Sequence, residues 1–97
     1  MYLLPGHSAE YKKRHDEIWP ELGVLLHQVG IHNYSIFLDE STRTLFGYLE
    51  APDLSTLDSL PAQEVMKKWW AYMADIMETN PDHSPVSIDL TPVFYFA

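Results

Sequence analysis

Several residue types and patterns are missing from this chain, and each absence excludes a class of protein or site. Cysteine is absent from the 97 residues, which rules out disulfides and thiolate metal sites. No apolar run approaches the roughly 20 residues of a membrane-spanning helix. The start, "MYLLPGH", lacks the basic and apolar regions of a secretory signal, so we expect a cytoplasmic location.

Positive charge is also scarce. Six Lys and Arg residues stand against 14 Asp and Glu residues, which gives a net charge of −8. This balance argues against binding to the phosphate backbone of a nucleic acid, because that binding depends on basic side chains. It also disfavours an anionic membrane surface or a polyanionic substrate. A neutral small molecule remains compatible with the charge.

The chain lacks the common short motifs of metal and nucleotide sites. It has no glycine-rich phosphate loop and no nucleophile elbow. The histidines are His7, His15, His27, His32 and His83. None of them forms an H-x-x-x-H or H-E-x-x-H pair, so a metal site has little support.

The composition that remains is that of one small globular domain, residues 1–97. Hydrophobic residues make up 46% and aromatic residues 13% of the chain. A domain of this size buries a smaller share of its surface than a large one does. A partner subunit would therefore stabilise the domain by covering more of its surface.

The first third of the sequence predicts a strand and a broken helix. Residues 1–4 favour a short strand. Ser8 is the predicted N-cap of a helical segment that ends near Gly30, the predicted C′ residue. Pro20 lies inside the segment and would clash with a carbonyl one turn back. We therefore expect a kink or a new helix start between His15 and Pro20.

Two alternating segments, 33–39 and 44–50, predict a β-hairpin joined by "ESTR". Side chains of a strand point alternately to its two faces. One face is predicted to carry Tyr34, Ile36, Leu38, Leu45 and Leu49. The other face is predicted to carry Ser35, Phe37, Phe46 and Tyr48.

The last third predicts a short helical piece at 53–60, a helix from Pro61 to about 78, a loop at 80–85 and a strand at 93–96. The resulting order, β-α-β-β-α-β, is that of an α+β ferredoxin-like domain. Helices would cover one face of its sheet and leave the other bare. We expect a homodimer that pairs through these sheet faces and forms an α/β barrel.

The adjacent Trp69 and Trp70 allow two interpretations. Neighbouring helical residues point about 100° apart, so both cannot occupy the centre of one narrow buried stripe. Both indoles can belong to a core that buries a wide arc of the helix. Alternatively, they form a flat aromatic wall beside a pocket, since indole faces pack well against sugars and other flat neutral ligands.

Tyr11 and His15 lie four residues apart and so share a helix face. Histidine is the side chain whose unperturbed pKa lies nearest neutrality, which suits acid–base catalysis. Lys12, Lys13 and Arg14 precede His15 and would lower its pKa if one lies close. The alternative is a surface or helix-end histidine without a catalytic role.

Four segments together resemble the L-rhamnose mutarotases. They are "EYKKRHDEIWPEL" (10–22), "HNYSIFLD" (32–39), "WWAYMADIM" (69–77) and "NPDHSPVS" (80–87). The resemblance covers nearly the whole chain. It implies a homodimeric, dimeric-α/β-barrel enzyme of bacterial rhamnose metabolism that interconverts the α and β anomers of L-rhamnopyranose without a metal or cofactor.

The resemblance also implies roles for particular residues. His15 would be catalytic. The substrate-binding residues would be Tyr11, Tyr34, Trp69 and Trp70. Anomers interconvert through the open-chain aldehyde, which requires one proton removed and one delivered, and an imidazole can do both in turn.

Two other classes of protein remain open at this point. One is a cofactor-free oxygenase or haem-handling protein of the same barrel architecture, because a fold alone does not fix a function. The other is a non-catalytic sugar-binding dimer. The second proton carrier is also open among water, a tyrosine and a substrate hydroxyl.

Overall fold

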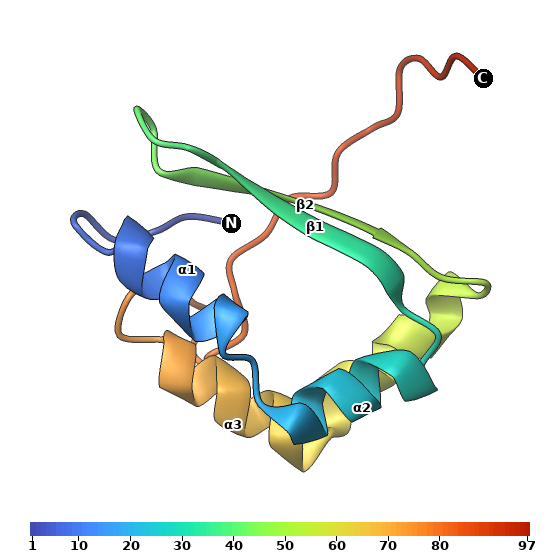
Figure 1. The fold of residues 1–97 in the computed structure, drawn as a ribbon, viewed down its shortest axis with the longest axis horizontal. Coiled ribbons are helices and arrows are strands. Elements are labelled where there is room, and N and C mark those ends of the chain that lie inside the picture. The colour runs from blue at the N-terminus through green and yellow to red at the C-terminus, as the bar shows by residue number, and fades with distance from the viewer.

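The computed structural model describes residues 1–97. Its elements are α1 (Ser8–Asp16), α2 (Pro20–Gln28), β1 (His32–Asp39), β2 (Thr44–Glu50), the 3-10 helix η1 (Leu54–Ala62) and α3 (Glu64–Met73). The helices lie on one side of the β1–β2 hairpin (Figure 1). The predicted α+β class is confirmed.

Proline divides the first helical segment as predicted. α1 ends at Asp16, and α2 begins at Pro20. Trp19 between them is extended, with ψ of 133°, because a residue that precedes proline avoids the helical region. The predicted cap is wrong by one residue: His7 is the N-cap, and no side chain caps the helix.

Gly30 ends α2 in the predicted way. Its φ is +88°, in the left-handed region that glycine enters at little cost. The Gly30 amide donates to the His27 carbonyl, and the Ile31 amide donates to the Leu26 carbonyl. These two bonds form a Schellman motif. The motif turns the chain from α2 into β1.

The hairpin has the predicted pair of faces. β1 and β2 are antiparallel, with Ile36 opposite Gly47 and Leu38 opposite Leu45. These four residues belong to the face toward the helices, which we call the inner face. Phe37 lies opposite Phe46 on the other face, the outer face.

The N-terminal segment extends this sheet beyond β2. Tyr2 forms a bridge with Thr44, and Leu3 forms one with Met77. The Leu4 amide donates to the Ile76 carbonyl at 3.0 Å, in line with the second bridge. The order across the sheet is therefore β1, β2, residues 1–4 and residues 76–79. The predicted first strand is confirmed as a row of isolated bridges.

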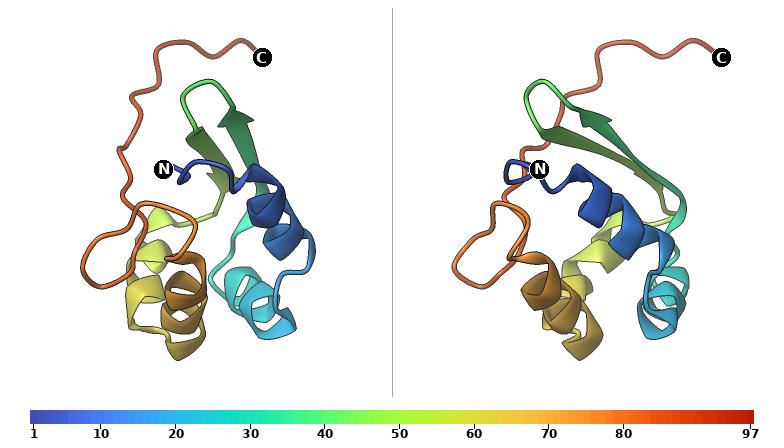
Figure 2. Two further views of the ribbon diagram at one scale, coloured as in Figure 1. Left: turned by 90° about the vertical axis from the view of Figure 1, so that its left-hand side faces the viewer. Right: turned by 60° about the vertical axis from the view of Figure 1, so that its left-hand side comes forward.

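Two predictions for the last third of the chain are wrong. Pro61 lies inside η1, and α3 covers only Glu64–Met73 instead of 61–78. The sheet-pairing segment is 76–79, whereas the predicted strand at 93–96 belongs to an extended, exposed tail. Figure 2 shows this tail running away from the helices. The buried pairing with the N-terminal segment ends the helix early.

The core lies between the inner face of the hairpin and the helices. Its fully buried side chains are those of Leu22, Met73 and Ile76. The other core residues are Leu3, Tyr11, Leu25, Leu45, Met66, Trp69 and Met77. None of the helices is both long and apolar enough to cross a bilayer.

Candidate active site

Helix α1 brings Tyr11 and His15 onto one face, as their spacing predicts. The two rings stack, with centroids 4.2 Å apart and planes 28° from parallel. Tyr11 is buried and His15 is half-buried. His15 does lie in the last turn of α1, but it is half-buried at the rim of the interior and is not an ordinary surface histidine.

The hydrogen bond of His15 fixes its tautomer. Nδ1 lies 3.1 Å from the Tyr11 carbonyl oxygen, one helical turn earlier. A carbonyl can only accept, so Nδ1 carries the proton. In the neutral ring, Nε2 is then the free acceptor. A fixed ring with a free Nε2 is suited to accepting a proton from a bound molecule.

Burial lowers the pKa of His15 below its ordinary value of 6.5. The hydrogen bond to the Tyr11 backbone and the charge of Asp16 act in the opposite direction and are smaller. The predicted direction is correct, but its proposed cause is wrong, because desolvation and not the neighbouring basic residues lowers the pKa. The imidazole is consequently neutral at pH 7.

The two tryptophans divide between core and rim. Trp69 is buried, at 5% exposed, and Trp70 is only partly buried. Trp69 meets His15 edge-on, with ring centroids 5.4 Å apart. Both indoles line the same cavity. Trp69 thus belongs to the core and to the cavity wall at once.

Trp69 packs against two further aromatic rings in a cluster that the sequence did not predict. Trp19 packs edge-on against Trp69 at 5.1 Å, and Tyr72 lies 5.7 Å from Trp69. Edge-to-face pairs of this kind add stability beyond the area they bury. Tyr72 follows Trp69 at helical spacing, but no local pattern links either residue to Trp19. The cluster holds the indole that touches His15.

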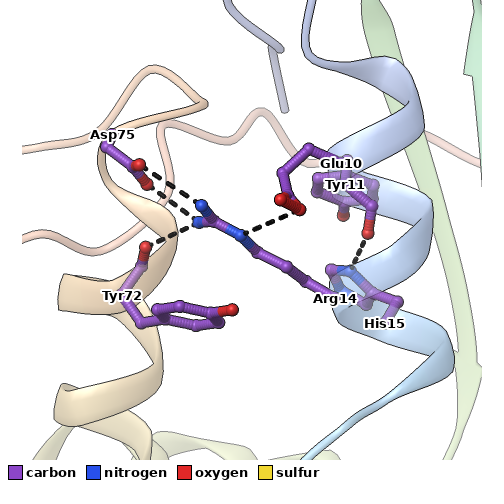
Figure 3. Close-up of polar contacts among 6 residues, drawn as sticks. All are labelled: Glu10, Tyr11, Arg14, His15, Tyr72 and Asp75. Atoms are coloured by element: carbon purple, nitrogen blue, oxygen red, sulfur yellow. Dashed lines mark hydrogen bonds and ion pairs between the residues drawn. The ribbon is translucent and has the colours of Figure 1, made fainter.

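Arg14 ties α1 to the end of α3, and Figure 3 shows its guanidinium between the two helices. Nη1 donates to Asp75 Oδ1 and to the Tyr72 carbonyl, both at 2.8 Å. The guanidinium also lies 4.3 Å from the centre of the Tyr72 ring. Its hydrogen bond lowers the pKa of the Asp75 carboxyl. Because Arg14 adjoins His15, this clamp fixes the helix that carries the imidazole.

Two phenols keep their protons in this site. Burial, followed by the nearby phenol of Tyr34, raises the pKa of Tyr11. Burial also raises the pKa of Tyr34. Both hydroxyls are therefore neutral hydrogen-bonding groups at pH 7 and not phenolate bases. They can donate to a ligand oxygen or accept from a ligand hydroxyl.

One cavity of about 1160 Å³ collects all five residues predicted for the site. This volume exceeds the ~300–1,000 Å³ of typical small-molecule pockets, so a monosaccharide fits with space to spare. Most of its lining is apolar. The lining also includes residues that the sequence did not assign to the site, among them Ile36, Met66, Met73, Asn80, Ser84 and Ser87.

The arrangement suits acid–base chemistry on a neutral, partly apolar molecule. His15 offers a proton acceptor near neutral pH, and Tyr11 and Tyr34 offer neutral hydroxyls. Trp69 and Trp70 supply aromatic surface beside them. Indole faces match the C–H faces of a sugar.

Comparison with known proteins gives a consistent result. The family model described as "L-rhamnose mutarotase" matches residues 1–96. An L-rhamnose mutarotase of Rhizobium leguminosarum bv. trifolii is 63% identical over 95 residues, which cover 98% of this chain and 90% of that protein. One from Listeria monocytogenes serovar 1/2a is 56% identical over 97 residues, covering 100% of this chain and 93% of the relative.

A solved structure agrees with these relatives. The crystal structure of an L-rhamnose mutarotase from Formosa agariphila superposes with a TM-score of 0.93 at 49% sequence identity. The match covers 100% of this chain and 93% of that one. The likeness therefore extends to the whole fold, including the elements that build the cavity.

Proposed function

This chain belongs to the L-rhamnose mutarotase family, and on that premise we infer that it is a carbohydrate isomerase that interconverts the α and β anomers of L-rhamnopyranose. The relatives at 55–63% identity carry that name, as does the solved structure. Their agreement favours this function over an oxygenase, a haem-handling protein or a non-catalytic sugar-binding dimer.

We propose His15 as the catalytic residue. The observation that supports this most strongly is its fixed ring: Nδ1 is committed to the Tyr11 carbonyl, which leaves Nε2 free on a neutral imidazole. Burial lowers its pKa, which keeps the imidazole neutral at pH 7 and ready to accept a proton.

The reaction proceeds by ring opening. Nε2 takes the proton of the anomeric hydroxyl, the C1–O bond to the ring oxygen breaks, and C1 becomes an aldehyde. The ring oxygen receives a proton from a second carrier. After rotation about C1–C2, the hydroxyl formed from the ring oxygen attacks the other face of the aldehyde. Its proton returns to the second carrier, and the imidazolium returns its proton to the aldehyde oxygen. The imidazolium formed in the first half is the acid of the second half.

We assign Tyr11, Tyr34, Trp69 and Trp70 to sugar binding. The two phenols keep their protons and suit hydrogen bonds to sugar hydroxyls. The indoles provide apolar surface for the C–H faces and for the methyl group of a 6-deoxy sugar. The second proton carrier is water, one of these phenols or a substrate hydroxyl.

We further propose a homodimer in which the outer faces of two hairpins pair, each chain contributing residues 1–97 as one domain. The outer face is rich in exposed aromatic groups: Phe37 is 63%, Phe46 43% and Tyr48 55% exposed. The tail adds Phe94, at 82% exposed. Large exposed apolar patches usually mark interaction surfaces. A monomer at micromolar concentration in light scattering would contradict the dimer.

Saturation-transfer NMR of anomer exchange tests the function directly. L-mannose is the matched control, because it differs from L-rhamnose only by a hydroxyl on C6. We expect catalytic amounts of protein to accelerate exchange of L-rhamnose more than that of L-mannose. Binding of L-rhamnose without faster exchange would instead support a sugar-binding protein. The cytoplasmic location stays a prediction, which cell fractionation tests.

A further inference from the structure

Strand β1 contains one extra residue near its start. His32 lies opposite Glu50 and Ser35 lies opposite Tyr48, so three steps along β1 correspond to two along β2. The register shift between His32 and Ser35 is a β-bulge. Asn33 lies within it and has a φ of +49°.

The bulge decides which way Tyr34 points. Side chains alternate along a regular strand, so residues three apart face opposite ways. His32 pairs with Glu50, two residues beyond Tyr48, and Ser35 pairs with Tyr48 on the outer face, although His32 and Ser35 lie three residues apart. The extra residue reconciles the two orientations. Without it, a strand with His32 on the outer face would turn Tyr34 to the outer face as well.

Gly47, which has no side chain, leaves room for the Tyr34 ring on the inner face. A Cβ atom placed on Gly47 would lie 3.9 Å from Tyr34 Cε1, so the ring packs over this glycine. Gly47 pairs with Ile36 on the inner face. The bulge and the glycine thus place the phenol against the hairpin, beside the cavity that contains His15.

Asn33 has both the conformation and the contact that hold the bulge. Positive φ is uncommon outside glycine, but asparagine tolerates it far better than a β-branched residue does. The Asn33 side-chain amide donates to Glu50 Oε2 at 2.6 Å across the hairpin. A charged acceptor strengthens such a bond. The two features keep the extra residue at one place in the register.

We propose that Asn33, held by Glu50, is a positioning residue that turns Tyr34 into the active-site cavity. The catalytic consequence rests on the proposed function, in which Tyr34 binds the sugar. The structural consequence, the orientation of the Tyr34 ring, is independent of any activity.

Three substitutions of Asn33 separate the effect of its backbone conformation from the effect of its side-chain hydrogen bond. Asn33→Val makes positive φ costly. Asn33→Gly keeps that conformation freely and removes only the amide bond to Glu50. Asn33→Ala meets the left-handed penalty without β-branching, and it carries the test if Asn33→Val does not fold. Arg43→Val is the matched control, because Arg43 has a φ of +58° at the other end of the hairpin.

The first readout is the nuclear Overhauser effect between the Tyr34 ring and the Gly47 Hα protons. We expect wild type and Arg43→Val to keep it, Asn33→Gly, which lacks the bond to Glu50, to keep it at reduced intensity, and Asn33→Val to lose it. The second readout is the steady-state rate of L-rhamnose exchange. Asn33→Val should raise KM about tenfold, as expected for one lost ligand contact, with a smaller change in kcat. Tyr34→Ala combined with Asn33→Val should raise KM no further than Tyr34→Ala alone.

An Asn33→Val protein that keeps the Tyr34–Gly47 effect would overturn the proposal, as would KM increases that multiply in the double variant. Loss of the effect in Arg43→Val as well would also overturn it, because the cause would then be general strain in the hairpin. If the wild type does not accelerate exchange, the proposed function fails, while the Overhauser effect still decides the role of Asn33.

Discussion

The two faces of the β1–β2 hairpin carry similar amounts of apolar side chain in very different surroundings. Leu45 on the inner face is 3% exposed, whereas the next residue, Phe46, is 43% exposed. Helices α1 and α3 complete the inner face, and the aromatic groups there are fixed by stacking and by the Arg14 clamp. Within a single chain nothing equivalent fixes Phe37 or Phe46. The inner face therefore suits catalysis, and the outer face suits assembly.

The largest expected effect is the loss of stability when the Trp69 side chain, which packs beneath the inner face, is removed. Trp69→Ala removes a buried indole and should lower the free energy of unfolding by ~3–5 kcal/mol. Trp70→Ala should cost less than half as much, because Trp70 is only partly buried. Urea unfolding of both variants measures the difference, and both should weaken L-rhamnose binding. Equal stability losses would contradict the division into core and rim.

The pair Leu45 and Phe46 tests the comparison most sharply, since the two residues adjoin on one strand. Leu45→Ala should lower the free energy of unfolding by ~2–5 kcal/mol. Phe46→Ala, measured at a dilution where the wild type is monomeric, should change it by no more than ~0.5 kcal/mol.

The same Phe46→Ala variant should dissociate more readily in sedimentation experiments, because its ring belongs to the proposed interface. A stability loss at that dilution as large as that of Leu45→Ala would show that the chain covers its own outer face.

The Arg14 clamp should be worth less than a core side chain. Arg14→Met keeps much of the aliphatic stem and removes the bonds to Asp75 and the Tyr72 carbonyl. We expect a loss of about 1–2 kcal/mol, the low range for charge-assisted bonds, because the Asp75 side chain is 65% exposed. Lys12→Met is the control, since the exposed Lys12–Asp16 pair on the same helix should contribute no more than ~0.5 kcal/mol. Equal urea midpoints for the two variants would contradict the clamp.

The smallest expected effect is a dependence of stability on pH. The pKa of His15 is lower in the folded chain than its ordinary value of 6.5, chiefly through burial. The unfolded chain therefore binds more protons between the two pKa values, and stability rises with pH across that window. The contribution of His15 to stability is fully present above its pKa in the unfolded chain, and it is lost as pH falls through its pKa in the folded chain.

Urea midpoints at several pH values, for wild type and His15→Asn, measure this dependence. The His15→Asn variant should lose the part of the slope that lies below pH 6.5. An unchanged slope would mean that His15 titrates alike in the folded and unfolded chains.

Local sequence patterns predicted the inner face well. The break at Pro20, the shared face of Tyr11 and His15, and the alternation along the hairpin all depend on neighbours within one turn or one strand. They could be predicted because proline geometry and side-chain periodicity are set by the residues themselves.

Contacts between distant segments could not be predicted in this way. The apolar run after Trp69 fits a longer helix equally well, and only pairing of Leu3 with Met77 decides that α3 ends at Met73. The packing of Trp19 on Trp69 likewise joins two elements with no shared pattern. The bulge at Asn33 leaves the alternation from Tyr34 onward intact, so the sequence gives no sign of it.

In the proposed mechanism His15 carries the proton during anomer exchange, and the exchange rates of three proteins decide whether it does. Saturation-transfer NMR with saturating L-rhamnose compares wild type, His15→Asn and the control His27→Asn, which makes the same change on the exposed side of α2. Loss of a general acid–base group should slow exchange by ~10²–10⁴-fold in His15→Asn, with fold and sugar binding retained. His27→Asn should match the wild type. Exchange by His15→Asn at near the wild-type rate would remove His15 from the mechanism.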